Sequence, residues 1–529
     1  MAEQTVRDVV RNLMREWEIT TVFGNPGTTE VPFLADWPDD FRYVLGLHET
    51  AVLAMADAYA QFTERPAIVS LHSAGGLGHA LGSLVTAYQN RAPLIVIAGQ
   101  QERSMLPYDP FLSAVDAAQF PKPWVKWSLE PTEAAAVPAA FARAYQVATQ
   151  PPYGPVFLSI PADDWLQPAE PLPAMPRVRG YGPDPDAIAE VAAALNAASR
   201  PALVLGAAVD IDNAVPDAIA LAEATRAAVY TAPFAARSPF PEDHPQFAGH
   251  LKPAKRKVHE ALAAYDLVVV IGAPAFTYHV PSKGEMPALP PLFLLNDDPQ
   301  VLARTPHATA VMATPRAAIR SLTARVETPE TREAPAPRQR RAKPAEPAAG
   351  ELMTAAYVYD ALTGILPSGV LVVEEAPSLR PDIQEHLPIT ARGGGFLTMA
   401  SGVLGYGLPA AVGAKMAQPG RPVVAVLGDG SSMYGIQALW TAAQEHVAAV
   451  FVILDNREYG AVREHAESSV GGKVPGQDLG GLDFCGLARS MGCDAVLVER
   501  PDELEPAVTG ALASGAPTLV HVRIQSGAQ

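Results

Sequence analysis

The chain has 529 residues, of which 49% are apolar and 18% charged, the balance of a globular protein with large cores rather than of a disordered chain. Its formal net charge of −17 argues against nucleic acid as a partner, because a protein that follows phosphates needs a basic face. Two cysteines, Cys485 and Cys493, without a CxxC pair argue against a disulfide framework and a structural zinc site. The length predicts about three domains.

The N-terminal residues 1–17 predict an amphipathic helix rather than a secretion signal, because apolar side chains recur on one face without a continuous apolar block. Elsewhere no apolar run approaches the ~18–20 residues that a membrane span needs. We therefore expect a cytoplasmic protein with no membrane partner.

Residues 1–180 alternate short β-branched runs with helix-like stretches. Such alternation, with nearly continuous apolar strands, predicts a doubly wound α/β domain around a parallel sheet. The expected strands are 20–24, 42–47, 67–71 and 94–99, and the expected helices are 49–62 and 77–90.

Two further α/β domains are predicted, at 181–326 and 351–529. Between them, residues 327–350 are rich in Pro, Ala and charge without apolar periodicity, which indicates a linker whose arginines are solvated. The fold class is thus α/β, with three doubly wound parallel-sheet domains. The expected strands of the last two domains are 202–206, 267–273, 292–297, 370–376, 423–430, 449–456 and 518–524.

A glycine-rich turn, Gly428-Asp429-Gly430, ends a buried strand and precedes a helix pattern. Glycines there let backbone N–H groups approach an anion, and the N-terminus of the next helix favours negative charge. An Asp in this turn would repel a phosphate unless a cation lay between them, and no Lys occurs from 416 to 472. The pattern predicts a divalent metal that bridges Asp429 to a diphosphate.

One strand–helix–strand step later, Asn456 ends the next strand and is expected beside Asp429. Oxygen ligands from an Asp, an Asn amide and a loop carbonyl suit Mg2+. The segment resembles the signature of thiamin-diphosphate-dependent enzymes, in which GDG is followed about two dozen residues later by a pair of Asn. The resemblance implies Asp429, Asn456 and the carbonyl of Glu458 as ligands, with Asp455 in place of the first Asn.

The resemblance also implies how the cofactor is held. Leu404 props it into a bent shape, and the carbonyl of Gly402 receives its aminopyrimidine. The residues implied around its diphosphate are Gly428, Gly430, Ser431, Ser432 and Tyr459.

Glu49 follows the predicted strand 42–47 and opens the helix 49–62. Taken alone, it is equally an acid favoured by the helix dipole and a buried acid that keeps a proton. The segments GNPGTTEVPF (24–33), LHETAVLAMADAYA (47–60) and LHSAGGLGHA (71–80) are similar to the pyrimidine-binding domain of thiamin diphosphate decarboxylases. The resemblance implies that Glu49 protonates the cofactor's aminopyrimidine.

Over nearly the whole chain, the resemblance is to benzoylformate decarboxylases, for example in TVFGNPGT, PLIVIAGQQ and QALWTAAQ. It implies that His72 and His279 divide the proton transfers, which imidazoles perform near neutral pH. It also places the hydroxyl of Thr28, where the family has Ser, on the substrate carboxylate.

The expected substrate pocket departs from the family. His465 stands in place of a Phe, Val462 in place of a larger Leu, and Pro377 in place of a Thr on the phosphate side, while Phe111 and Leu112 add apolar contacts. We expect an aryl or branched 2-keto acid, with benzoylformate as the first candidate and carboligation as a side activity.

Other thiamin diphosphate enzymes, such as a branched 2-keto acid decarboxylase, an acetohydroxyacid synthase or a 2-hydroxyacyl-CoA lyase, stay open as alternatives, and with them a nucleotide in the middle domain. A non-catalytic homologue is disfavoured because Glu49, His72, His279, Asp429 and Asn456 are all retained. Since the family brings the acid and the metal turn together between two subunits, we expect at least a dimer, and by resemblance a homotetramer.

Overall fold

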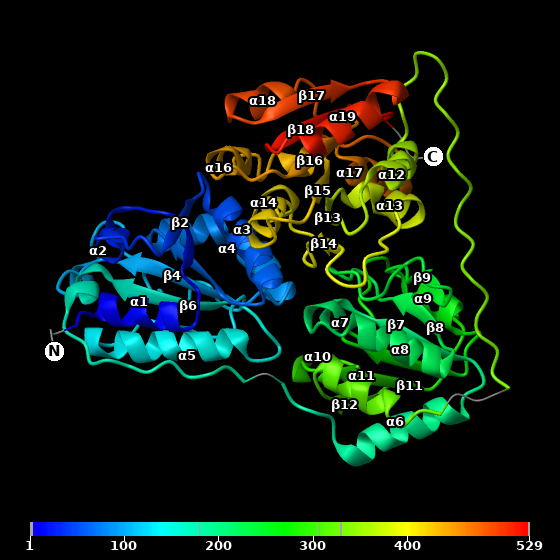
Figure 1. Cartoon of the computed structure of the whole chain (residues 1–529), viewed down its shortest axis with the longest axis horizontal. Coiled ribbons are helices and arrows are strands. Elements are labelled where there is room, and N and C mark those ends of the chain that lie inside the picture. Colours follow the sequence, from blue (N-terminus) through cyan, green and yellow to red (C-terminus); the bar gives the residue numbers. More distant parts are fainter. Residues whose placement is uncertain (1–3, 179, 306, 328–330, 527–529) are drawn as a thin grey trace.

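The computed structural model describes residues 4–178, 180–305, 307–327 and 331–526. Three α/β units are visible in Figure 1, coloured blue to cyan, green, and yellow to red along the chain. Each contains a six-stranded sheet in which neighbouring strands run parallel. The predicted architecture of three parallel-sheet units is confirmed.

The first unit has the strand order β2-β1-β3-β4-β6-β5, and every residue of the central strands β3 and β4 is buried. Its strands are β1 (Thr21–Asn25), β2 (Arg42–Leu45), β3 (Ala67–Leu71), β4 (Leu94–Gln100), β5 (Ser128–Leu129) and β6 (Val156–Pro161). Its helices are α1 (Val6–Glu16), α2 (Val31–Leu34), α3 (Glu49–Thr63), α4 (Ser73–Gln89) and α5 (Val137–Thr149), with short 3-10 turns η1 (Thr28–Glu30), η2 (Leu106–Tyr108), η3 (Ala134–Ala136) and η4 (Ala162–Leu166).

The second unit has the order β12-β11-β10-β7-β8-β9, again with its most apolar strands at the centre. Its strands are β7 (Pro201–Leu205), β8 (Ala228–Thr231), β9 (Phe247–His250), β10 (Leu267–Ile271), β11 (Leu292–Asn296) and β12 (Thr309–Met312). Its helices are α6 (Pro185–Ala197), α7 (Ala207–Ile211), α8 (Val215–Thr225), α9 (Lys255–Leu262), α10 (Pro299–Ala303) and α11 (Pro315–Thr323).

The third unit has the order β14-β13-β15-β16-β18-β17. Its strands are β13 (Leu371–Glu375), β14 (Phe396–Thr398), β15 (Val423–Gly428), β16 (Val450–Asp455), β17 (Asp494–Val498) and β18 (Thr518–Arg523). Its helices are α12 (Ala355–Ile365), α13 (Arg380–His386), α14 (Gly407–Ala417), α15 (Asp429–Ser432), α16 (Ala438–Gln444), α17 (Gly460–Val470), α18 (Phe484–Ser490) and α19 (Pro501–Ala513), with the 3-10 turn η5 (Pro377–Leu379).

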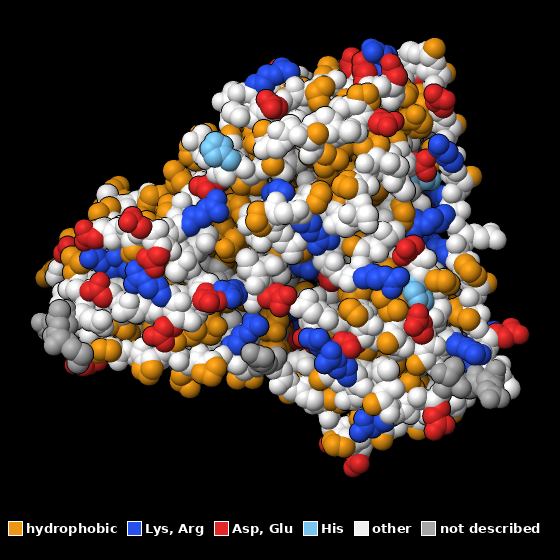
Figure 2. Space-filling model, in the orientation of Figure 1, with side chains coloured by type: hydrophobic (Ala, Val, Ile, Leu, Met, Phe, Trp, Pro, Cys, Tyr) orange, Lys and Arg blue, Asp and Glu red, His pale blue; other side chains and the backbone are white. Residues whose placement is uncertain are grey.

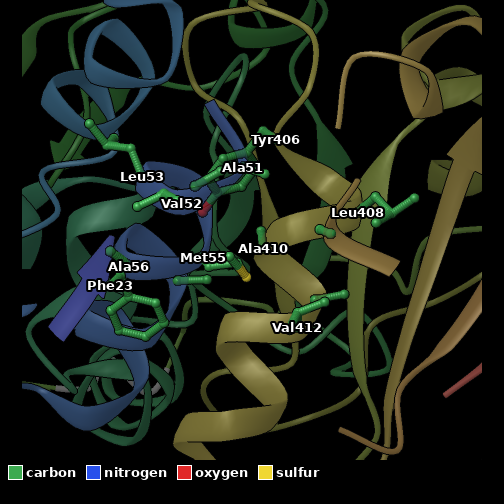
Figure 3. Packing of buried hydrophobic residues seen from close by; sticks show 14 of the residues in the cluster. Phe23, Ala51, Val52, Leu53, Met55, Ala56, Tyr406, Leu408, Ala410 and Val412 are labelled. Atoms are coloured by element: carbon green, nitrogen blue, oxygen red, sulfur yellow. The ribbon is translucent and has the colours of Figure 1, made fainter. Parts of the chain in front are cut away.

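The first and third units share one hydrophobic core, centred on helices α3 and α14 (Figure 3). Their backbones approach so closely that a side chain at Gly413 would collide with the carbonyl group of Met55. Small residues such as Ala51 and Ala410 make this approach possible and are fully buried within it. The contact fixes helix α3, and with it Glu49 at its first position, relative to the third unit.

The linker differs from its prediction as a solvated segment. Its described part, which crosses from the green unit to α12 in Figure 1, carries arginines that bind the domains. Arg332 is buried and donates to the carbonyl oxygens of Thr225 and Leu195, each at 2.7 Å. Arg338 pairs with Glu385 of the third unit at 2.8 Å. The amino-acid composition of the linker could not show that these arginines have acceptors on the neighbouring domains.

The surface gives no sign of a nucleic-acid interface on the face shown in Figure 2, where Lys and Arg are interspersed with Asp and Glu. Among the helices of the described residues, none combines the length and the apolar character needed to cross a membrane.

A buried polar cluster lies where α3 meets the third unit. The carboxylate of Asp57 is fully buried and accepts hydrogen bonds from Tyr406 Oη at 2.7 Å and Gln61 Nε2 at 2.6 Å, with Asn90 Nδ2 at 3.4 Å. Burial raises the pKa of Asp57 to about 6, since the three donors only partly replace water. The junction therefore contains an acid that ionises near neutral pH.

Because the folded-state pKa of Asp57 lies above its ordinary value of 3.8, its ionisation costs stability, and the cost grows as the pH rises from 4 through 6. Asp57→Asn removes this titration. We expect the free energy of unfolding of the variant, relative to the wild type, to rise by about 1.5 kcal/mol between about pH 5 and pH 7.5, as measured by urea unfolding.

The matched control is Asp39→Asn, since Asp39 is exposed. Its difference from the wild type should not change with pH. An equally flat difference for Asp57→Asn would show that Asp57 keeps an ordinary pKa.

Candidate active site

The metal turn predicted from the sequence lies at the carboxyl end of β15, where α15 begins at once. Asp429 is buried; its Oδ1 accepts the N–H of Gly430 at 2.7 Å, whereas its Oδ2 is buried without a hydrogen-bond partner among the described residues. Burial and the neighbouring carboxylate of Asp455 raise the pKa of Asp429 to about 7. A buried carboxylate oxygen without a partner costs free energy that a bound cation would recover.

The neighbouring strand β16 brings the second half of the turn alongside, since Gly428 is in register with Leu454. Asn456 Oδ1 accepts the N–H of Glu458 at 3.2 Å, and the carboxylate of Glu458 pairs with Arg463 at 2.9 Å. The carboxylate of Glu458 is therefore paired, while its carbonyl oxygen accepts the N–H of Gly460 at 3.0 Å and keeps a second lone pair. Asp429, Asn456 and Glu458 thus follow the carboxyl ends of two paired strands and carry oxygen donors of the type that Mg2+ prefers.

Asp455, which stands where the family has Asn, has its own partners. His521 Nε2 lies 2.8 Å and Arg523 Nε 3.3 Å from its Oδ2. Although burial opposes them, these partners lower the pKa of Asp455. Asp455 therefore has a negative charge that its own partners compensate, whereas ionisation of Asp429 would need a further cation.

The two serines of the turn support its backbone. Ser431 Oγ donates to the carbonyl oxygen of Glu375 at 2.6 Å, and Ser432 Oγ donates to that of Gly428 at 2.6 Å. Gly430 has no room for a side chain, because a Cβ there would collide with the ring of Tyr459. The two serines and the ring of Tyr459 therefore fix the backbone of the turn. Its N–H groups are the ones that would face a diphosphate.

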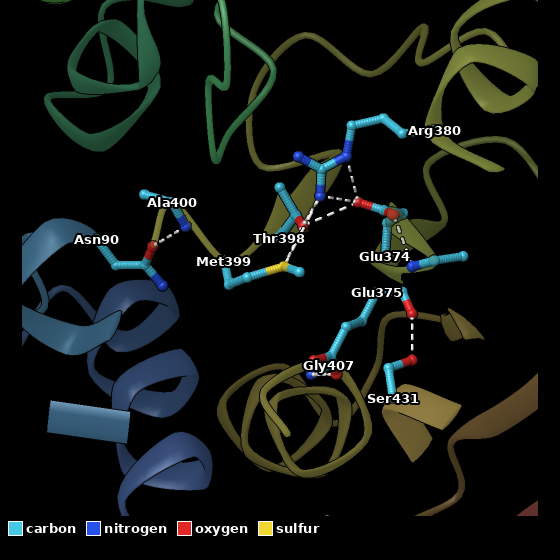
Figure 4. Close-up of polar contacts among 10 residues, drawn as sticks. Asn90, Glu374, Glu375, Arg380, Thr398, Met399, Ala400, Gly407 and Ser431 are labelled. Atoms are coloured by element: carbon cyan, nitrogen blue, oxygen red, sulfur yellow. Dashed lines mark hydrogen bonds and ion pairs between the residues drawn. The ribbon is translucent and has the colours of Figure 1, made fainter. Parts of the chain in front are cut away.

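Glu375 joins this turn to the segment that contains Gly402 and Leu404 (Figure 4). Its fully buried carboxylate accepts the N–H groups of Gly405 at 2.6 Å and Gly407 at 2.7 Å. Burial raises the pKa of Glu375 to about 8, so it is mostly protonated at neutral pH. Sequence reasoning missed this residue, although two adjacent acids inside the otherwise apolar segment 370–376 were a visible signal.

Gly402 itself adopts φ +76°, a left-handed conformation that a side chain would strain, and Leu404 packs against the shared core. The same loop is tied to the first unit, since Asn90 Oδ1 accepts the N–H of Ala400 at 2.9 Å. Contacts from the first and the third unit therefore fix the loop that contains Leu404 and the carbonyl group of Gly402.

On the first unit, Glu49 is buried at the start of α3. Its carboxylate accepts from Asn25 Nδ2 at 3.1 Å and lies 3.1 Å from His79 Nδ1. His72, at the N-terminus of α4, has its Nδ1 3.0 Å from both Glu30 Oε2 and Thr29 Oγ1. Both contacts of His72 are made by Nδ1, so Nε2 is the ring nitrogen that they leave open. Asn25, Glu30 and His79 are partners that the sequence did not reveal.

The remaining predicted residues are solvent-facing in the single chain. Thr28, His279 and His465 are exposed. Phe111 is 87% exposed, and Leu112 and Val462 are each 44% exposed. Within the described parts of one chain, the hydrogen bonds of Glu49 stay in the first unit and those of Asp429 stay in the third.

A cavity of about 400 Å³ lies between the second and third units. His279 and Pro377 line it from opposite sides, together with Phe234, Arg380 and Glu464. Asp429, Asn456 and Glu458 are not among the residues that line it. Arg380 is held in place by Glu374 and Thr398, as Figure 4 shows. None of Phe111, Leu112, Val462 and His465 belongs to its lining.

Comparison with known proteins agrees with this geometry. Residues 4–121, 188–322 and 381–522 match the N-terminal thiamine pyrophosphate-binding, central and C-terminal thiamine pyrophosphate-binding domains of the thiamine pyrophosphate enzymes. A benzoylformate decarboxylase of Pseudomonas aeruginosa is 42% identical, with 99% of each chain covered. A putative acetolactate synthase large subunit of Mycobacterium tuberculosis is 30% identical over 97% of this chain and 98% of that one.

Among solved structures, a benzoylformate decarboxylase from Polynucleobacter necessarius superposes with a TM-score of 0.96 at 38% identity, covering 99% of both chains. The chain therefore belongs to the thiamine pyrophosphate enzymes, and within them to the thiamin-diphosphate-dependent 2-keto acid decarboxylase family.

Proposed function

We propose that the protein is a thiamin diphosphate- and Mg2+-dependent carboxy-lyase that converts an aryl 2-keto acid, with benzoylformate as the first candidate, into an aldehyde and CO2. The observation that carries the proposal is the buried, unpartnered Oδ2 of Asp429, in a turn that also offers oxygens of Asn456 and Glu458. The benzoylformate decarboxylase relative, with 99% of both chains covered, supports the choice of substrate.

In this proposal Asp429, Asn456 and the carbonyl group of Glu458 hold Mg2+, and the backbone N–H groups around Gly430 and Ser431 receive the diphosphate. The donor set fits, because it consists of oxygens and one of them is an orphaned carboxylate oxygen. When bound, thiamin diphosphate supplies the electron sink that loss of CO2 from a 2-keto acid requires.

The chain's own residues then divide the proton chemistry. Glu49 holds a proton for the cofactor's aminopyrimidine, and Asn25 orients its carboxyl group. The carbonyl group of Gly402 would accept a hydrogen bond from the cofactor's aminopyrimidine, and the side chain of Leu404 would support its rings. His72 presents Nε2 because Glu30 and Thr29 occupy Nδ1, so it can protonate the developing substrate oxygen.

His279 and Thr28 complete the substrate side of the proposed site. His279 lines the cavity between the second and third units, and we assign to it the exchange of a proton with the product oxygen. Thr28 offers a hydroxyl from the first position of η1, which suits a substrate carboxylate. Pro377 offers no side-chain hydrogen bond in this cavity, whereas Arg380 and Glu464 offer charged groups.

The assembly follows from the separation of the two halves. Glu49 and Asp429 make their hydrogen bonds in different units, and the first unit exposes large apolar side chains, with Phe111 at 87% and Tyr108 at 83%. We propose that a second copy covers this surface and that its metal turn faces Glu49, with a homotetramer as the complete assembly. We also propose domain boundaries near residues 180, 326 and 350, and a cytoplasmic location.

Addition of benzoylformate to protein loaded with thiamin diphosphate and Mg2+ should release CO2 and benzaldehyde, measured by coupled reduction of the aldehyde. Removal of Mg2+ with a chelator should abolish turnover, and renewed Mg2+ should restore it. A panel with pyruvate, branched 2-keto acids and 4-hydroxybenzoylformate tests the substrate class. If no 2-keto acid turns over while the cofactor is shown to be bound, the decarboxylase proposal is wrong.

Glu49→Gln keeps the size of the side chain but removes the acid. We expect kcat to fall by about 10²–10⁴-fold, the usual contribution of a positioned acid–base group, while thiamin diphosphate still binds, as measured by calorimetry. The control is Glu133→Gln, at an exposed acid. Unchanged turnover in Glu49→Gln would show that another group performs this role.

Glu375→Gln should weaken cofactor binding, because an amide offers one acceptor oxygen to the two N–H groups of Gly405 and Gly407. We expect the thiamin diphosphate concentration for half-maximal activity to rise about tenfold, while KM for the 2-keto acid changes little. Glu505→Gln, at an exposed acid of α19, serves as the control. Equal cofactor affinities in the two variants would contradict a positioning role for Glu375.

A further inference from the structure

Three side chains that could bind a metal lie close together where the N-terminus of α3 packs beside α4. His48 is the N-cap residue of α3, Glu49 is its first residue, and His79 lies within α4. One potential ligand atom from each lies within 4.8 Å of the other two. The two imidazole rings are stacked, with centroids 5.4 Å apart and planes inclined by 24°. The proposed decarboxylation uses Glu49 but assigns no metal here.

The donor set differs in kind from that of the metal turn. Two imidazole nitrogens and one carboxylate oxygen are ligands for Zn2+ and similar transition metals, whereas Mg2+ prefers oxygens alone. His79 Nδ1 and Glu49 Oε2 are 3.1 Å apart, close to the spacing of about 3.4 Å expected between two ligands of tetrahedral Zn2+. The pair that now shares a hydrogen bond could thus hold a metal ion in its place.

Closing the third side of the site requires small movements. The three ligand atoms lie within 4.8 Å of one another, so a pair that lies beyond the tetrahedral spacing must move closer to bind one ion. The side chain of His79 is 64% exposed, so it can rotate, whereas Glu49 is 9% exposed and stays fixed. Nδ1 of His48 accepts the N–H of Thr50 at 3.2 Å, a bond that is lost if His48 binds the ion through this nitrogen. His48 is therefore the weaker of the two imidazole ligands.

We propose that His48, Glu49 and His79 form a binding site for Zn2+ in the cofactor-free protein, and that the bound ion excludes thiamin diphosphate by occupying the carboxylate of Glu49. The binding site stands on the geometry alone. The exclusion of the cofactor rests on the proposed function, in which the same carboxylate faces the aminopyrimidine. Zinc would then act as an inhibitor of cofactor loading, while Mg2+ at Asp429 would not.

The first experiment measures zinc binding without any substrate. Cofactor-free protein is dialysed against Zn2+ in excess Mg2+, and the bound metal is counted. We expect one Zn2+ per chain beyond any held at the metal turn, an affinity at least tenfold weaker in His79→Asn, and a smaller loss in His48→Asn. Asp429→Asn should retain this zinc.

His446→Asn is the matched control, because His446 is exposed on the third unit and its φ of +51° is one that Asn accepts. Zinc binding should be unchanged in this variant. Equal zinc affinity in His79→Asn and the wild type would overturn the site.

The second experiment measures cofactor affinity by fluorescence at increasing Zn2+. The wild type should need at least tenfold more thiamin diphosphate for half-saturation when zinc fills the site, and His79→Asn should be much less sensitive. Zinc bound at this cluster with no change in cofactor affinity would overturn the exclusion. Failure of every 2-keto acid to react would leave the zinc stoichiometry intact, so the two proposals fail separately.

Discussion

The site depends on one buried carboxyl group, that of Glu375. It accepts two backbone N–H groups from the loop that carries Leu404, while its own carbonyl oxygen receives Ser431 from the metal turn. The distance between the two ends of the proposed cofactor site is therefore set by one residue at the end of β13. No cation pairs with this carboxylate among the described residues, and its raised pKa is the cost of using it as a spacer.

Helix α3 connects the loop held by Glu375 to Glu49, the proposed acid. Its first residue, Glu49, is the proposed acid, and its second turn packs on α14 at Gly413. Two residues beyond Met55, Asp57 accepts a hydrogen bond from Tyr406, the residue between the two glycines that Glu375 holds. Glu49, the α3–α14 contact and the loop that contains Leu404 are thus connected through α3. A displacement of α3 would therefore move all three.

Much of the fold could be predicted because the central strands are apolar on both faces, as in 67–71 and 423–427. Among the strands that were not predicted, β12 and β17 lie at sheet edges and are partly exposed, which leaves no continuous apolar run. The central strand β6 was also missed, although all its residues are buried and its apolar run was a visible signal. The metal turn was predictable, since adjacent parallel strands end at the same edge. Asp57 and the linker arginines were not, because their partners lie on another domain. Glu375 was missed because its partners are backbone N–H groups, which a pattern of side chains does not reveal.

The linker arginines have a consequence for how such proteins evolve. Arg332 fills a site on the second unit, Arg338 pairs with Glu385 of the third, and Arg340 lies 3.6 Å from Glu242 of the second. The connecting segment is therefore matched to both neighbours rather than to length alone. If recombination exchanges the middle domain between relatives, the contacts of Arg332 and Arg340 are kept only when the linker is inherited together with that domain. Arg338 would still need an acidic partner on the third unit.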